Sequence, residues 1–253
     1  MKTIGIIGLG NMGFALWQYL QQNEYDVVVY DPYVKAEEKV KQLDDISEIW
    51  QRASIVLVCV KPNKVQEILR TAEKATKVVS IAAGVSITSM AESLPTGSAV
   101  VRLMPNLPLL VGQGCIGYFG AEELYLDVEE VFSQVGKVFR LNSEQAMDAF
   151  TAIAGSGPAF VLAFAQAMAE GGVLSGIPYQ ESLQWVLQTM QGTVALLGSE
   201  MEKNPAMHPG TLRNRVTSPG GTTIEGLKYL EKGKMNYVVM EAVYQTYLKA
   251  KGK

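Results

Sequence analysis

The first 140 residues alternate short apolar runs with segments of mixed polar and apolar residues. Runs rich in Val and Ile predict strands at Thr3–Ile7, Asp26–Tyr30, Ile55–Val60, Val78–Ile81, Ala99–Leu103, Cys115–Phe119 and Lys137–Arg140. The segments between them predict helices at Met12–Gln22, Val34–Leu43, Lys64–Ala75, Ile87–Ser93 and Leu126–Gln134. Continuous apolar runs without alternation are typical of strands covered on both faces. The repeated strand–helix order therefore predicts a doubly wound, mostly parallel sheet.

The pattern changes near Leu141–Ser143. Ser143 is a suitable N-cap, and no strand pattern follows it. Helices are predicted from Pro158 to about Leu174, from Pro178 to about Leu197, from about Ile224, and over Lys234–Lys249. We therefore expect an α/β domain over residues 1–142 and an all-helical domain over residues 143–253. The helical half has Ala-rich and Met-rich faces that one small bundle cannot easily cover, which indicates a subunit interface.

A glycine-rich turn joins the first strand to the first helix. It reads Gly8-Leu9-Gly10-Asn11-Met12-Gly13. Glycines permit a tight turn and close backbone approach, and the helix N-terminus offers free N–H groups to a pyrophosphate. Asp31 ends the second strand, at the spacing where a carboxylate usually holds the ribose. The turn and Asp31 together predict dinucleotide binding through Gly8, Gly10, Asn11, Met12, Gly13 and Asp31.

Asp31 also bears on which dinucleotide binds. A carboxylate accepts hydrogen bonds from a ribose diol and repels a 2′-phosphate, which favours NADH. Lys35 and Lys39 lie nearby in the sequence and could pair with that phosphate, so NADPH stays open. Alternatively, Asp31 only caps the turn before Pro32.

Ligands of open parallel sheets bind at the carboxyl ends of the strands. Three further strand ends carry candidate cofactor residues: Val60, Lys61 and Pro62 after the third strand, Ala82 and Ala83 after the fourth, and Asn106 after the fifth. Small residues and prolines there allow a nicotinamide to lie close to the backbone, and Asn106 could bind its carboxamide. Lys61 could equally be an ordinary solvated lysine.

The composition excludes several classes of function. Two cysteines and one histidine cannot build a Cys/His zinc site, so we expect no metal, and Cys59 and Cys115 are expected to be free thiols in a reducing compartment. The N-terminus lacks the features of a signal peptide, so a cytoplasmic location is expected. A net charge of −3 without a dense Lys/Arg run points to neither nucleic acid nor an anionic membrane.

One uncharged stretch, Ala149–Ala169, is long enough to span a bilayer. Gly155-Ser156-Gly157-Pro158 interrupts it near its start, which favours a buried helix over a membrane span.

The residue inventory also limits the chemistry. Removing a hydroxyl proton requires a base in the pocket. The single histidine, His208, lies in a predicted loop without an obvious carboxylate partner. The β-hydroxyacid dehydrogenases share this two-domain plan and place a lysine on the helix after the nucleotide domain, whereas Gly155–Met168 contains none. Imine reduction needs chiefly orientation of the substrate and hydride donor, because a protonated C=N group is already electrophilic.

Two segments, TAIAGSGPAFVLAFAQAMAEGG at 151–172 and VTSPGGTTIEGL at 216–227, resemble the pyrroline-5-carboxylate reductases, which catalyse the last step of proline synthesis. VKP at 60–62, SIAAGVSI at 80–87, VVRLMPNLP at 100–108 and HPGTLRNRV at 208–216 match the same family. The resemblance covers nearly the whole chain, and the SPGGTT segment is more specific than the glycine turn. It implies a Rossmann-like domain that binds NADP or NAD, and a helical domain exchanged between the subunits of a dimer, which can assemble further.

The segment Ser218-Pro219-Gly220-Gly221-Thr222-Thr223 is itself suited to an anion. Successive backbone N–H groups in such a turn form a nest for a carboxylate. By resemblance, Ser218, Gly221 and Thr222 surround the substrate carboxylate with Gly220 in the same turn, and Thr223 acts on the ring nitrogen. Alternatively, the segment is only the capped start of a helix.

Two departures from the family concern the pocket. The segment Pro32–Ser54 is short, and Leu107-Pro108-Leu109-Leu110 replaces smaller residues. Reduction of another cyclic imine acid therefore stays open, as does a regulatory protein that binds the dinucleotide without turnover.

Overall fold

The computed structural model describes residues 2–34 and 40–252. The chain divides into two compact units, one formed by Met1–Pro158 with Gln245–Lys253 and one by Ala159–Tyr244. The predicted change of pattern falls where α6 (Glu144–Phe150) begins, and the Ser143 hydroxyl caps that helix by accepting a hydrogen bond from the Ala146 N–H at 3.2 Å.

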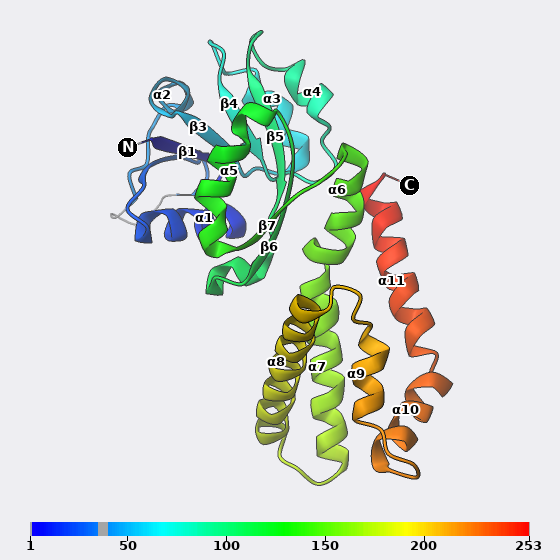
Figure 1. Ribbon diagram of the computed structural model, residues 1–253. Coiled ribbons are helices and arrows are strands. Elements are labelled where there is room, and N and C mark those ends of the chain that lie inside the picture. The colour runs from blue at the N-terminus through cyan, green and yellow to red at the C-terminus, as the bar shows by residue number, and fades with distance from the viewer. Residues whose placement is uncertain (1, 35–39, 253) are drawn as a thin grey trace. The chain divides into compact units, whose positions relative to one another are not determined.

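The first unit is built on one seven-stranded sheet (Figure 1). The strands are β1 (Thr3–Ile7), β2 (Asp26–Tyr30), β3 (Ile55–Val58), β4 (Lys77–Ser80), β5 (Ala99–Met104), β6 (Gly114–Gly120) and β7 (Gly136–Arg140). Their order is β2-β1-β3-β4-β5-β6-β7, and all neighbours are parallel except β5 and β6. This confirms the doubly wound, mostly parallel sheet that the sequence predicts.

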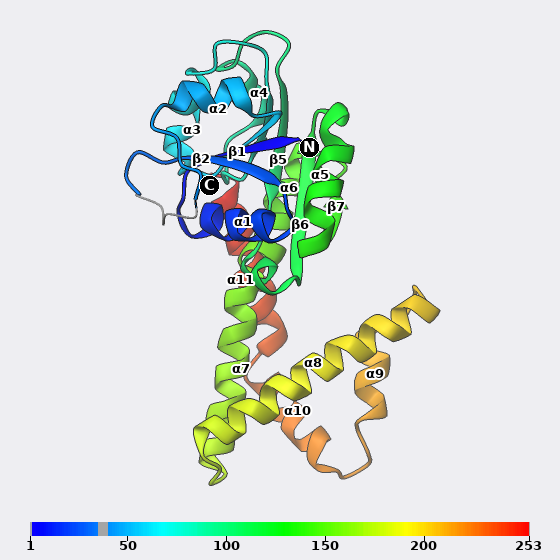
Figure 2. The ribbon, with the colours of Figure 1, turned by 90° about the vertical axis from the view of Figure 1, so that its left-hand side faces the viewer.

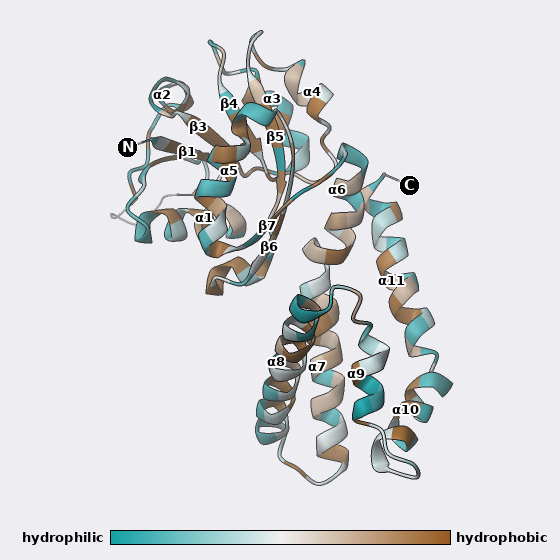
Figure 3. Ribbon diagram, in the orientation of Figure 1, coloured by the Kyte–Doolittle hydropathy of each residue, from teal (hydrophilic) through white to brown (hydrophobic). Residues whose placement is uncertain are grey.

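Helices cover both faces of this sheet. The helices of the first unit are α1 (Asn11–Gln22), α2 (Ile46–Arg52), α3 (Val65–Leu69), α4 (Ile87–Ala91), α5 (Tyr125–Phe132) and α6. Leu16 of α1 and Phe132 of α5 pack in one core cluster, whereas Trp50 of α2 and Leu69 of α3 pack in another. Successive residues of the central strands β1 to β3 alternate between the two clusters, so these strands are mostly apolar (Figure 3).

The segment after β2 differs from its prediction. The helix expected over Val34–Leu43 lies partly outside the described residues, and its described end is not helical. The Val29 N–H donates to the Lys41 carbonyl at 3.0 Å, and the Leu43 N–H donates to the Val29 carbonyl at 2.8 Å. Residues 41–43 thus pair with Val29 at the free edge of β2, a tertiary pairing that the local pattern does not indicate. The next helix, α2, was not predicted, and Asp45 caps it by accepting from the Ser47 N–H at 2.9 Å.

The second unit contains only helices among its described residues. They are α7 (Gly157–Leu174), α8 (Tyr179–Lys203), α9 (Pro209–Arg215), α10 (Thr222–Lys232) and α11 (Met235–Ala250), of which α7 begins and α11 ends in the first unit. The helices α7 and α8 cross each other (Figure 2), and Ala165 and Ala169 of α7 pack against Val186 of α8. Gly172 allows this close approach, because a Cβ there would lie 2.0 Å from the Ser182 Oγ.

Much apolar surface of the second unit is exposed. Large apolar side chains with at least 40% exposure on α7 are Val161, Leu162, Phe164, Met168, Val173 and Leu174. By length and composition alone, one helical run, Glu144–Leu174, also qualifies as a possible membrane span.

Candidate dinucleotide and substrate sites

The predicted cofactor residues gather at one edge of the sheet. The strands β1 to β5 are parallel, so their carboxyl ends share one edge, and the predicted residues follow those ends. The strand order reverses between β1 and β3, which is the position where open α/β sheets usually bind ligands.

The glycine turn has a backbone that larger residues would disrupt. Gly8 has φ +100°, in the region that favours glycine, and its N–H donates to the Tyr30 carbonyl at 2.9 Å. A Cβ on Gly13 would lie 2.0 Å from the Gly8 carbonyl oxygen. These two glycines therefore let α1 start close against β1 and β3.

The start of α1 is open toward a ligand. Gly10 is its N-cap, no side chain caps the helix, and its first turn contains no acidic residue. A Cβ on Gly10 would meet no atom within 4 Å among the described residues. The free N–H groups of the first turn, beside this open space, fit the pyrophosphate of a dinucleotide.

The carboxylate of Asp31, which follows β2, accepts hydrogen bonds from two turns. Its Oδ2 accepts a hydrogen bond from the Leu9 N–H at 2.7 Å, and its Oδ1 accepts from Tyr33 and Val34 at 2.8 and 3.1 Å. The side chain therefore both caps the turn after β2 and holds the glycine turn. A carboxylate has about four acceptor positions, so Oδ2 keeps capacity for one ribose hydroxyl.

The ends of β3 and β4 supply mostly backbone and small side chains. Lys61 is exposed and precedes a 3-10 turn that starts at Pro62. Ala82 is buried and Ala83 is exposed, next to Gly84 with φ +72°. Just before Val60, burial raises the pKa of the Cys59 thiol to about 12, which favours the neutral thiol at neutral pH.

Asn106 is buried, with 7% exposure, and both ends of its amide are bonded to backbone. Its Nδ2 donates to the Ala154 carbonyl at 3.0 Å, and its Oδ1 accepts from the Cys115 N–H at 2.8 Å. The sequence predicts a ligand for the nicotinamide carboxamide at this position. The structure shows that the side chain already links the end of β5 to β6 and to the segment after α6.

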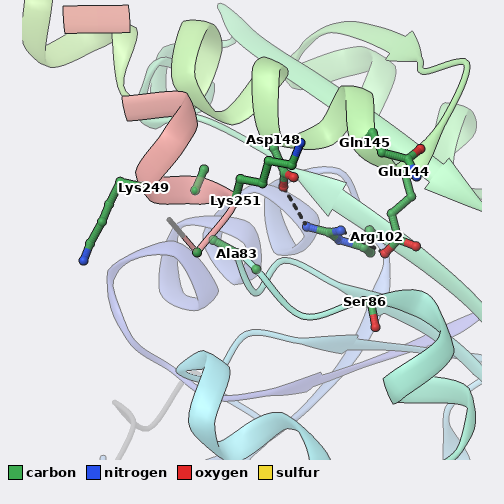
Figure 4. A pocket seen from close by; sticks show the side chains of 11 residues that line it. Ala83, Ser86, Arg102, Glu144, Gln145, Asp148, Lys249 and Lys251 are labelled. Carbon is green, nitrogen blue, oxygen red and sulfur yellow. Dashed lines mark hydrogen bonds and ion pairs between the residues drawn. The ribbon is translucent and has the colours of Figure 1, made fainter. Parts of the chain in front are cut away.

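Sequence reasoning missed a buried ion-pair network at the same face of β5. Arg102 has 5% exposure, and its Nη1 lies 2.9 Å from Oε1 of Glu144 on α6 (Figure 4). The same Oε1 accepts the Ile87 N–H at 2.8 Å, and Asp148 lies 4.0 Å from Arg102 Nη2. A buried arginine in a mostly apolar strand requires acidic partners. Glu144 and Asp148 are four residues apart and so lie on one face of a helix, and this pattern in the sequence could have identified them as those partners.

The predicted substrate segment lies in the second unit. Gly220 has φ +69°, and the Gly221 N–H donates to the Ser218 carbonyl at 3.0 Å, which closes a tight turn before α10. Gly221 is the N-cap of α10 and has no side chain to satisfy the first N–H groups of the helix. Thr222 and Thr223 are exposed in that first turn. The segment therefore presents backbone N–H groups and hydroxyls, as an anion nest requires.

His208 is exposed and has a local partner. Its Nδ1 accepts from the Gly210 N–H at 3.0 Å, so it caps α9, a helix that the sequence did not predict. The described residues contain no group of three or more His, Cys, Asp or Glu side chains that could hold a metal ion.

Family comparisons match both halves of the chain. Residues 144–253 match the family described as pyrroline-5-carboxylate reductase dimerisation. Residues 3–84 match the family described as NADP oxidoreductase, coenzyme F420-dependent.

Individual relatives match over almost the full length. The chain is 38% identical to the pyrroline-5-carboxylate reductase of Aquifex aeolicus, over 98% of this chain and 96% of the relative. It is 35% identical to that of Methanosarcina acetivorans, with 99% and 97% covered. A crystal structure of Plasmodium falciparum pyrroline carboxylate reductase with NADP bound matches with a TM-score of 0.88 and 30% identity, over 99% and 97% of the two chains. The 1-pyrroline-5-carboxylate reductase of Streptococcus pyogenes matches with a TM-score of 0.89 and 28% identity, over 100% and 99%.

Proposed function

The chain belongs to the pyrroline-5-carboxylate reductase family, and we propose that it reduces 1-pyrroline-5-carboxylate to L-proline with NAD(P)H. In this reaction the C=N carbon gains a hydride, the nitrogen gains a proton, and the dinucleotide leaves oxidised. The observation that carries the proposal is the full-length match, which includes both the glycine turn and the SPGGTT segment.

The dinucleotide would bind at the carboxyl edge of the sheet. The open N-terminus of α1 and the space beside Gly10 suit its pyrophosphate, and Oδ2 of Asp31 suits a ribose hydroxyl. When bound, it supplies the hydride. We propose Gly8, Gly10, Asn11, Met12, Gly13, Asp31, Val60, Lys61, Pro62, Ala82 and Ala83 as the residues that contact the dinucleotide. Asn106 belongs to the same site, but its amide is already bonded to the backbone of Ala154 and Cys115. The negative charge of Asp31 favours NADH over NADPH, although a P. falciparum relative binds NADP.

The substrate carboxylate would bind in the turn before α10. Gly221 leaves the first N–H groups of α10 without a side-chain cap, and the positive end of the α10 dipole favours an anion there. Ser218, Gly220, Gly221, Thr222 and Thr223 form this proposed substrate site.

Thr223 would orient the ring nitrogen. Its hydroxyl can accept or donate a hydrogen bond, so it can hold the protonated imine and later the amine. We expect Thr223→Ala to lower kcat only about tenfold, because solvent can also protonate the nitrogen. An unchanged kcat would show that Thr223 has no role in the chemical step.

We propose that the helical residues 143–253 form a homodimer with intertwined helical domains, beside a dinucleotide-binding domain over residues 1–142. The exposed apolar side chains of α7 support this, because exposed apolar surface of that extent usually marks an interface. The same interface would cover the apolar run Glu144–Leu174, so that no membrane is required. Light scattering coupled to size-exclusion chromatography would show a dimer or a multiple of one, and a monomer would contradict the proposal.

The two free thiols support a cytoplasmic location, and the small acidic net charge supports a small molecule rather than nucleic acid as the partner.

The decisive experiment is oxidation of NADH and of NADPH, followed by absorbance at 340 nm, with and without 1-pyrroline-5-carboxylate. Oxidation that depends on the substrate would establish the reaction. Oxidation only with a five- or six-membered imine that carries its C=N bond at the carboxylate-bearing carbon would instead indicate a different cyclic imine reductase. Dinucleotide binding without any oxidation would indicate a protein that only binds it.

A further inference from the structure

Side chains on one face of β5 and just after it contact α6 and the turn of helix at the start of the TAIAGSGP motif. Arg102 and Met104 point to the same face of the strand, and Asn106 follows two residues later. Arg102 pairs with Glu144 at the start of α6. Met104 Sδ lies 3.6 Å from where a Cβ of Gly155 would be, and Asn106 donates to the Ala154 carbonyl.

The segment that Asn106 contacts is an unusual turn of helix. Thr151–Gly155 is a π-helical turn, in which the Ser156 N–H donates to the Thr151 carbonyl at 3.0 Å. Such turns often occur at functional sites. They are less stable than α-helix, so a π turn persists where its surroundings hold it.

Pro158 explains why Asn106 is needed. In an α-helix the Ala154 carbonyl would accept from the N–H four residues later, but residue 158 is a proline and has no N–H. The Asn106 amide donates to that carbonyl instead, at 3.0 Å. Because Ala154 is buried, its carbonyl would otherwise lose water without gaining a partner.

We propose that Asn106 is a positioning residue, which fixes the π turn Thr151–Gly155 against the carboxyl end of β5. This inference rests on the proposed reductase function. The carboxyl end of β5 is where we place the nicotinamide, so the turn forms part of the wall beside the reacting ring. Asn106 acts through Ala154 and Cys115, with both ends of its amide engaged, and direct binding of the carboxamide is not its main role.

The test compares Asn106→Ser, Pro158→Ala and the double variant with the wild type. The Ser hydroxyl is too short to bridge Ala154 and Cys115, and Pro158→Ala restores a backbone N–H four residues after Ala154. The measurements are kcat and KM, the Kd of NADH by titration calorimetry, and hydrogen exchange of the Ser156 amide, all well below the Tm.

For Asn106→Ser we expect kcat to fall about tenfold, the Kd of NADH to change less than about twofold, and Ser156 to exchange faster. In the double variant, the Ser156 amide should regain part of its protection from hydrogen exchange, and kcat should recover in part. A fall in NADH affinity as large as the fall in kcat would overturn the inference and make Asn106 a direct cofactor ligand. Unchanged turnover per folded molecule would also overturn it, because the residue would then serve stability alone.

These outcomes are separable from failure of the proposed function. If the wild type oxidises no NAD(P)H with the pyrroline, the reductase function fails. Exchange at Ser156 would then still report whether Asn106 holds the π turn.

Discussion

The carboxylate of Asp31 accepts a hydrogen bond from the backbone N–H of Leu9 at 2.7 Å. The acidic residue at the end of β2 therefore holds the glycine turn at the end of β1, besides capping its own turn through Tyr33 and Val34. One side chain thus shapes the turn that we propose for the pyrophosphate and sets the charge near the proposed ribose site.

Asp31→Asn should raise the NADPH/NADH ratio of kcat/KM about fivefold. The amide oxygen of the new side chain can still accept from Leu9, whereas its NH2 group loses the bonds from Tyr33 and Val34 and loosens the cap of their turn. The negative charge that opposes a 2′-phosphate is removed, and about 1 kcal/mol is a modest value for one charge near solvent. Kinetics with both dinucleotides at fixed substrate measures this ratio.

Asp26→Asn is the matched control, because it removes the same charge at the other end of β2. An equal shift in both variants would show an effect of net charge rather than of the ribose site.

Gly10 and Gly13 should respond oppositely to alanine. Gly13→Ala places a Cβ 2.0 Å from the Gly8 carbonyl and should lower the Tm by about 5 °C or more. Gly10→Ala has free space and φ −63°, so its Tm should stay within about 2 °C, while NADH affinity falls about tenfold because the new methyl group occupies the pyrophosphate space. Thermal unfolding and calorimetric titration distinguish the two effects. Full NADH affinity in Gly10→Ala would place the pyrophosphate elsewhere.

The sequence predicts the sheet well because the signal is local. The Val and Ile runs of β1 and β2 are continuous, and both strands occur at the predicted residues. Residues 41–43 and the partners of Asn106 could not be predicted in this way. Val29 pairs with residues 41–43 at the sheet edge, and Asn106 donates to a carbonyl 48 residues away, so only the folded chain defines these contacts.

Gly221→Val should abolish most turnover while NADH affinity stays within about twofold. A Cβ at this position would lie 2.4 Å from the Ser218 Oγ, so the side chain would displace the turn that we assign to the substrate carboxylate. Steady-state kinetics should show kcat/KM for the pyrroline reduced at least a hundredfold, about 2.7 kcal/mol of binding and transition-state stabilisation.

Gly226→Ala, in the same helix, is the control. A Cβ there meets no described atom within 4 Å, so activity should be retained and stability should rise by about 0.5–1 kcal/mol. Normal activity of Gly221→Val would show that this segment is not part of the active site.

Cys59 should resist thiol reagents in the native protein. Burial raises its pKa to about 12, so the reactive thiolate is scarce at pH 8 and becomes abundant only as the pH approaches that value. Burial also raises the pKa of Cys115. Labelling with a chromogenic disulfide at pH 8 should be slow in the folded protein and should reach two thiols per chain in denaturant. Rapid labelling of Cys59, mapped by mass spectrometry, would show that the β3 end opens readily.

Arg102→Met should destabilise the first unit strongly. The substitution leaves the Glu144 carboxylate partly buried, with the Ile87 N–H but without its cation. Loss of one partner from a buried ion pair costs about 3–5 kcal/mol, which corresponds to roughly 6–20 °C in Tm for a chain of this size. The second substitution Glu144→Gln should recover part of this loss, because its amide oxygen can still accept from Ile87 without a buried charge.

Lys228→Met is the control, because it removes the exposed pair with Glu225 and should cost less than about 1 kcal/mol. Equal losses for Arg102→Met and Lys228→Met, measured by urea unfolding, would mean that water reaches Arg102 and that α6 does not depend on this contact with β5.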